Sequence, residues 1–316
     1  MKNSLLTSMT FALALAATSR AEEGGAGHYM PGTTASFIDA LPGYPAFAVE
    51  NVFTFYGASV SGSVALPVGG RTTLGLDATA YADSLVAFYE TPLRLLGGNY
   101  AAGLALPYVW MEAKATVTGP LGNTFARRDT ASGLGDITVI PFILGWTNGP
   151  DLKYDVRLNI FAPSGEYDVG ALANVGKNYW TVDPMVSVSY LSSKIGLEVS
   201  AFAGVDFNTE NHATDYQTGT QFHLDGTIAQ HLPLLGGVIG VGANGFYYQQ
   251  ISGDSGAGAT LGDFKGRTVG VGPALSYIRK LGKTTNLAAE VKWLPELETE
   301  NRLKGNYVWF KLALVF

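Results

Sequence analysis

The final twelve residues, GNYVWFKLALVF, alternate between two kinds of side chain up to the last position. Phe310, Leu312, Leu314 and Phe316 share one face and are all apolar, whereas Lys311 lies on the opposite face. Because side chains alternate across a strand, this period of two predicts a strand with one apolar face and one mixed face. The remainder of the chain must show whether the apolar face meets a protein core or lipid.

The amino-acid composition favours lipid as the surroundings of this apolar face. Hydrophobic residues make up 47% of the 316 residues and charged residues only 15%, against roughly 25% charged in an average soluble domain. Beyond the N-terminus no run of about 18 apolar residues occurs, so a transmembrane helix is not predicted. The chain contains no cysteine, which excludes disulfides and thiolate metal sites. The net charge of −6, without a basic run, argues against a nucleic-acid partner.

Residues 1–21 have the pattern of a secretory signal peptide. Lys2 supplies the positive charge, an apolar stretch follows, and Ser19-Arg20-Ala21 places small residues for cleavage before Glu22. The alternative is a short N-terminal anchor helix, but the apolar stretch is short and is soon followed by EEGGAG. We therefore expect the mature chain to leave the cytoplasm of a bacterium.

Strand-like segments fill most of the remaining sequence, and the gaps between them alternate in length. Short turns are expected at 148–150, 191–194, 232–236 and 280–283, and long polar loops at 116–135, 163–178, 208–219, 252–266 and 295–305. The connection after the second segment is longer than this pattern requires and could be a small helix or a strand extension. The twelve expected strands are 46–58, 71–84, 98–113, 134–147, 151–162, 179–191, 195–207, 219–231, 236–249, 266–279, 284–295 and 305–316.

Long loops at one rim and short turns at the other are typical of an outer-membrane barrel. The fold class predicted is therefore all-β, a transmembrane antiparallel β-barrel of about 12 strands spanning 46–316, with both termini in the periplasm. In hydrocarbon every backbone polar group must be paired, so the last strand must close against the first. Residues 22–45 are rich in glycine and proline and are expected to form either a loose periplasmic segment or a partial plug of the lumen.

Alternation also assigns side chains to surroundings. Phe310, Leu312, Leu314 and Phe316 form the strand expected to face lipid and to be recognised by the barrel-assembly machinery. The residues expected in extracellular loops are Asn208, Glu210, Asn211, Asp215, Tyr216 and Asp254. Aromatic girdles at the two interfaces are expected from Tyr56, Tyr81, Tyr108, Trp110, Trp146, Trp180, Tyr190, Tyr247 and Tyr248. The residues expected to line the lumen, as ion-paired struts or as a charged constriction, are Lys153, Asp155, Arg157, Glu198, Asp206, His223, Asp225, Glu290, Lys292 and Lys311.

Motifs for catalysis or cofactors are weak. GVGANG at 240–245 matches a dinucleotide fingerprint but no helix pattern follows it, so a barrel-strand role for its glycines is expected. The four histidines lack zinc-enzyme spacing, and we predict neither metal nor cofactor. His223 with Asp225, and a serine from Ser187, Ser189 or Ser200, could form the site of a lipid-modifying hydrolase. A histidine in a luminal hydrogen-bond network is the favoured interpretation.

Five collinear segments, GHYMPG (27–32), GLGDITVIPFILGW (133–146), 163–184, 208–226 and 251–273, resemble an outer-membrane transporter-like family connected with the meta-cleavage pathway of phenol degradation. The resemblance implies a barrel that takes up small aromatic or other hydrophobic compounds. We therefore expect a passive, non-enzymatic channel in the outer membrane of a Gram-negative bacterium, surrounded by lipid and lipopolysaccharide. A hydrolase using His223 and a structural or adhesive barrel are the alternatives.

Overall fold

The computed structural model describes residues 22–118, 124–262 and 265–316, so the expected signal peptide lies outside the described residues. Within them, no helix is long and apolar enough to cross a membrane. The described elements are two short 3-10 helices, η1 (Glu23–Gly25) and η2 (Phe37–Asp39), and the strands β1 (Ala46–Val68), β2 (Arg71–Leu95), β3 (Gly98–Thr118), β4 (Thr124–Leu134), β5 (Ile137–Asn148), β6 (Leu152–Ala162), β7 (Thr181–Leu191), β8 (Leu197–Asn208), β9 (Gln221–Leu234), β10 (Gly237–Gln250), β11 (Arg267–Lys280), β12 (Asn286–Glu300) and β13 (Lys304–Val315).

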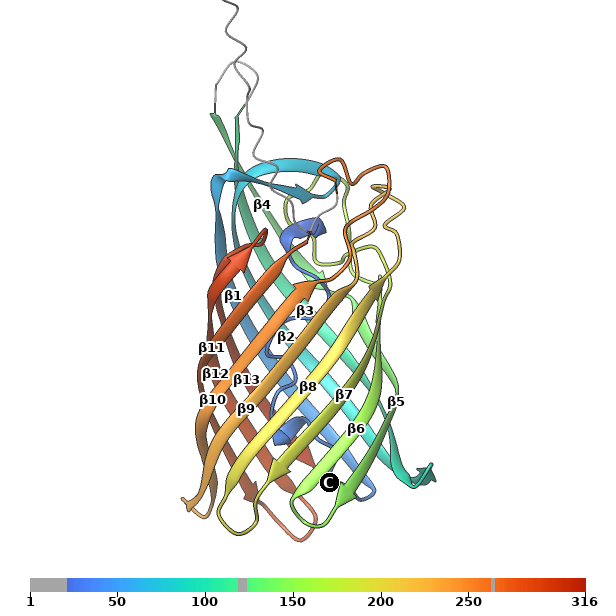
Figure 1. The fold of residues 1–316 in the computed structure, drawn as a ribbon, viewed down its shortest axis with the longest axis vertical. Helices are drawn as coiled ribbons and strands as arrows, with labels where there is room; N and C mark the ends of the chain where they lie inside the picture. Colours follow the sequence, from blue (N-terminus) through green and yellow to red (C-terminus); the bar gives the residue numbers. More distant parts are fainter. Residues whose placement is uncertain (1–21, 119–123, 263–264) are drawn as a thin grey trace, which may run out of the picture.

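The strands form one closed antiparallel barrel (Figure 1). β4 and β5 pair with successive parts of β3, so the thirteen strands occupy twelve positions in the wall, as predicted. β13 closes the sheet against β1, and beyond their paired ends Phe316 and Phe47 exchange backbone hydrogen bonds of 2.8 and 3.2 Å. The alternating C-terminal segment is therefore the closing strand of the barrel.

The two faces of β13 meet different surroundings. Phe310 and Leu312 on the outer face are 43% and 38% exposed, whereas Trp309 and Lys311 on the inner face are each 4% exposed. Most of the expected girdle aromatics likewise point outward, among them Tyr81, Trp110 and Trp180. Tyr56 and Tyr248 do not, because each lies on the inner parity of its strand and is buried in the lumen. Their assignment to a girdle was wrong.

The connections at the two rims differ in length as expected (Figure 1), but two of the predicted long loops are largely continuations of strands. Residues 116–135 and 295–305 mostly extend β3, β4, β12 and β13, and the stretch after residue 58 extends β1 and β2. Above the hydrocarbon zone both faces of a hairpin meet water, so its outer face carries charges, such as Glu112 bonded to Lys114 at 2.7 Å. Such a sequence loses the apolar alternation and therefore looks like a loop.

The longer strands end in tight turns. The second connection is a strand extension that closes at Leu96-Gly97, where φ is 51° and 78°, and Leu235-Gly236 repeats this geometry at 53° and 72°. Positive φ at both central residues is the geometry of two-residue hairpin turns whose twist matches the strands, and glycine adopts it without strain.

A substitution on β13 tests the assignment of the two faces. Leu312→Arg places a charge on the apolar outer face and is expected to destabilise the folded barrel in the membrane, by up to the roughly 2–4 kcal/mol that a lipid-facing arginine costs at the bilayer midplane. Ala313→Ser, one residue on and buried inside, is the control and should cost far less. The measurement is the folded fraction in lipid vesicles as a function of urea concentration, and the heat-modifiable shift on a gel reports that fraction. A larger cost for the inner substitution would reverse the assignment.

Candidate solute pathway through the barrel

Residues 22–45 run the length of the barrel interior (Figure 1). At the long-loop end, the buried Glu22 forms an ion pair with Arg302 and accepts hydrogen bonds from Tyr248 (2.9 Å) and Gln221 (3.0 Å). At the short-turn end, Gly43 donates to Glu90 at 3.0 Å. The described chain therefore begins at the long-loop end of the lumen. The expectation that both termini lie at the short-turn end was wrong, because the segment crosses the barrel once before β1 begins.

Between these ends, charged side chains of the wall hold the backbone of the segment. Asp225 accepts from the Gly32 N–H at 2.5 Å and from the Tyr29 hydroxyl at 2.7 Å. Glu198 accepts from the Phe37 N–H at 2.8 Å. Arg157 in turn donates a hydrogen bond to the backbone carbonyl of Asp39 at 2.9 Å, and Lys153 donates one to the backbone carbonyl of Leu41 at 2.8 Å. The segment is thus attached to the part of the wall formed by β6 to β9, and by β13 through Lys311.

All the side chains predicted to line the lumen face the interior. Nine are buried and Lys153 is partly exposed. Glu290 and Lys292 are 3.0 Å apart, and Glu290 lies opposite Lys311 in the register. Glu198 pairs in register with Ala229 and bonds His231 at 2.8 Å, so it does not lie beside His223. A role for these charges in selecting solutes stays a prediction, since most of them bind the segment or one another.

The opposite part of the wall, formed by β1 to β5, leaves open space beside the segment. A cavity of about 580 Å³ runs there, and we call it the apolar cavity. Its lining reaches from Gly69 and Leu172 at the long-loop end to Tyr44 and Val315 at the short-turn end. The side chains that β2, β3 and β5 contribute are small or apolar, namely Ala78, Ala80, Ala82, Ser84, Val86, Phe88, Ala105, Pro107, Val109, Met111, Thr138, Ile140 and Ile143.

Sequence reasoning missed this apolar wall. It assigned the lumen from charged residues, and the inner face of β1 to β3 beside the cavity carries a single charge, Glu50, among small and apolar side chains. A signal was present in DATAYADSLVAF (77–88), where Ala78, Ala80, Ala82 and Ser84 recur at every second position between larger outward residues such as Tyr81 and Leu85. Small residues on one face of a strand leave room on that face.

The tip of the β1–β2 hairpin covers the long-loop end of the apolar cavity. The Gly69 carbonyl accepts a hydrogen bond from the Gly170 N–H at 2.6 Å, so the tip reaches the loop between β6 and β7. Leu66, Leu172 and Leu303 are buried in the same hydrophobic cluster. A solute entering from that side meets an apolar cover made of a hairpin and a loop.

The expected extracellular residues all lie at the long-loop end, but they differ in role. Asn211 is buried and donates to Glu23 of the segment at 3.0 Å, and Asn208 donates to Gln221 at 2.7 Å. Glu210 lies near His212 and Asp215 is exposed at a turn with φ of 49°. The loops 209–220 and 251–262 are joined where Asp254 accepts hydrogen bonds from Tyr216 and, at 2.8 Å, from the Gly219 N–H.

Asp254 makes this loop contact dependent on pH. Burial raises the pKa of Asp254 to about 6, although hydrogen bonds from Tyr216 and Gly219 oppose the shift. A folded-state pKa above the ordinary value favours the protonated carboxyl, so its stabilisation is full below about pH 4 and is lost as the pH rises through 6. A spin label at Thr260→Cys, in a chain without cysteine, should become more mobile between pH 4 and pH 7.5. Asp254→Asn should remove this change, and a change that persists would contradict the assignment.

His223 does not meet the geometry of a serine hydrolase. Its Nε2 atom lies 3.1 Å from Asp183, and its ring stacks on Tyr29 with 3.5 Å between centroids. The candidate serines bond elsewhere: Ser187 donates to Asp155 at 2.6 Å, and Ser200, within 2.8 Å of Ser189, donates to Glu198 at 2.8 Å. A nucleophilic serine requires its base within hydrogen-bonding reach.

The family model described as "Putative MetA-pathway of phenol degradation" matches residues 61–312, well over half of the chain. The chain belongs to this family. No curated protein sequence matches it.

Solved structures that are similar to the chain include two outer-membrane proteins. The COG4313 outer membrane channel from Pseudomonas putida F1 is 14% identical, with a TM-score of 0.58 over 91% of this chain and 100% of that one. The β domain of the Bordetella autotransporter BrkA is also 14% identical, with a TM-score of 0.45 over 85% of this chain and 98% of that one. The likeness to the COG4313 channel shows that this chain has the fold of an outer-membrane barrel.

Proposed function

We propose that the protein is a passive outer-membrane channel for small apolar or aromatic molecules of the phenol type. The observation that carries this proposal is the division of the lumen, in which the polar wall is occupied by residues 22–45 while the apolar cavity extends along β1 to β5. Its volume of about 580 Å³ lies within the roughly 300–1,000 Å³ of small-molecule sites. A single aromatic ring is small compared with this space.

The chemistry of the walls favours neutral solutes over ions. A phenol gains by leaving water for a wall of alanine, valine and isoleucine side chains, and it keeps one hydroxyl for a polar contact such as Thr54 or Thr138. An ion loses hydration beside the uncharged side chains that β2, β3 and β5 contribute, and the charged lining residues Glu50 and Arg157 are themselves buried. The proposed direction is inward, down the concentration gradient. The proposed setting is the outer membrane of a Gram-negative bacterium, where the barrel would be surrounded by lipid and lipopolysaccharide after delivery by the signal peptide at 1–21.

The test is uptake of radiolabelled phenol by porin-deficient cells with an intact lipopolysaccharide layer. This layer matters because phospholipid alone is permeable to phenol. Cells that express the protein should take up phenol faster than cells with the empty vector, while uptake of glucose should rise little. Equal phenol uptake in folded, surface-located protein would reject the proposal. Release of fatty acid from membrane lipid would then favour the hydrolase, and cell attachment without either activity would favour an adhesive barrel.

A further inference from the structure

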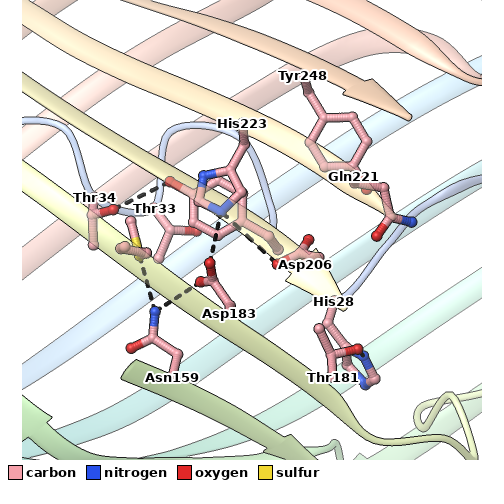
Figure 2. Close-up of polar contacts among 12 residues, drawn as sticks. His28, Thr33, Thr34, Asn159, Thr181, Asp183, Asp206, Gln221, His223 and Tyr248 are labelled. Carbon is pink, nitrogen blue, oxygen red and sulfur yellow. Dashed lines mark hydrogen bonds and ion pairs between the residues drawn. The ribbon is translucent and has the colours of Figure 1, made fainter. Parts of the chain in front are cut away.

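Three ionisable side chains, Asp183, Asp206 and His223, meet on the inner face of β7, β8 and β9 (Figure 2), and the ring of Tyr29 stacks on that of His223. Nε2 of His223 lies 3.1 Å from Oδ1 of Asp183 and 3.8 Å from Oδ1 of Asp206. One ligand atom from each of the three residues lies within 4.8 Å of the others. All three side chains are 0% exposed. Asp183 was not singled out from the sequence, because it is the one charged residue of β7.

The charges of this cluster do not balance within the described part of the chain. Asp183 accepts from His223 and from the Asn159 amide at 2.9 Å, but both oxygens of Asp206 lack a hydrogen-bond partner among the described residues. Two buried carboxylates face one histidine, and a further carboxylate, Asp225, lies two residues along β9 and bonds Tyr29. A buried carboxylate without a partner is strongly unfavourable, so Asp206 points to a missing positive charge.

A glycine keeps the space between these groups open. Gly204 on β8 lies opposite His223 in the register, and a Cβ atom there would lie 2.5 Å from both Asp183 Oδ1 and His223 Nε2. Any other residue would therefore displace the pair. The donor set of one imidazole nitrogen and two carboxylate oxygens suits Zn²⁺ and similar divalent ions, whereas Mg²⁺ and Ca²⁺ prefer oxygen alone.

We propose that Asp183, Asp206 and His223 bind one divalent transition-metal ion of the Zn²⁺ class inside the barrel wall. Such an ion neutralises the two carboxylates and gives the oxygens of Asp206 a partner. It also fixes the imidazole ring on which Tyr29 stacks, so the metal would strengthen the attachment of residues 22–45 to the wall. The site differs from the proposed solute pathway, and the proposal stands whether or not the barrel transports phenols.

The experiment measures zinc bound to the whole mature protein. Because the cluster is buried, the protein is refolded with ZnCl₂ or with EDTA, washed with a chelator and analysed by mass spectrometry for metal. One retained zinc per chain is expected, and refolding with CoCl₂ should give the visible absorption of a bound Co²⁺ ion. Asp206→Asn should weaken zinc binding by more than about a hundredfold. Glu290→Gln, which changes another buried luminal carboxylate, should retain one zinc.

Controls separate this site from others. His212→Ala removes the exposed histidine beside Glu210 and should leave the retained zinc unchanged. If Asp206→Asn does not give the folded gel band, two other measurements decide. The unaltered protein should retain one zinc per chain, and Gly204→Ala, whose Cβ displaces Asp183 and His223, should retain less. No retained zinc in the folded unaltered protein, equal retention of MgCl₂-supplied Mg²⁺, or full zinc binding by folded Asp206→Asn would each overturn the proposal.

Discussion

Ala82→Trp is expected to lower phenol uptake by cells carrying the protein by at least roughly tenfold, because pore width limits flux. Ala82 lies on the inner face of β2, between Thr54 and Val109 in the register, and all three line the apolar cavity. The residues around it are held by the barrel hydrogen bonds, so the wall cannot move outward to restore the space. An indole ring at this position must therefore project into the pathway.

The matched control is Ala87→Trp on the same strand. Ala87 pairs with Val49 and Leu104 on the outer face, where an indole meets lipid instead of solute. We expect unchanged phenol uptake for this variant at equal amounts of folded protein in the outer membrane. Ala105→Trp, on the neighbouring strand and within the lining, should repeat the loss. Unchanged uptake by both inner variants would mean that solutes follow another path, and the proposed function would fall with it.

The barrel itself could be predicted because lipid imposes a strict rule on each strand. Where a strand crosses hydrocarbon, one face must be apolar, and the alternation in 152–160, 197–207, 221–228, 287–293 and 308–316 followed that rule closely enough to put every predicted luminal charge on the inner face. Above the membrane the rule no longer applies. The ends of β3, β4 and β12 are therefore strands with charges on the outer face, which a pattern search reads as loops.

The contents of the lumen were harder to predict. Whether residues 22–45 enter the barrel depends on partners distant in sequence, such as Arg302 for Glu22 and Asp225 for Tyr29, and no periodicity connects these pairs. The same holds for the Asp183–Asp206–His223 cluster, since three neighbouring strands each contribute one residue. Alternation placed Asp206 and His223 on the inner face, but only the strand register brings them together with Asp183.

Deleting residues 23–43 is expected to raise ion conductance through the barrel several-fold in planar bilayers. The segment occupies the polar part of the lumen, and its removal would leave Arg157, Glu198, Asp225 and Lys311 facing water instead of the backbone groups they now bind. A wall of fixed charges around water conducts ions, whereas the apolar cavity does not offer them hydration. The barrel should still fold, because closure depends on the pairing of β1 with β13 and not on the segment.

The fate of phenol uptake in this deletion separates two roles for the segment. If the apolar wall carries solutes by itself, phenol uptake persists while glucose now enters as well, so the segment acts as the barrier that makes the channel selective. Asp39→Asn, which weakens the attachment to Lys311 without shortening the chain, should give brief openings of the same conductance instead of a constant current. A deletion variant that folds and conducts no better than the intact protein would show that the segment does not limit the lumen, and the hairpin tip formed by Leu66 to Gly70 would become the barrier to test.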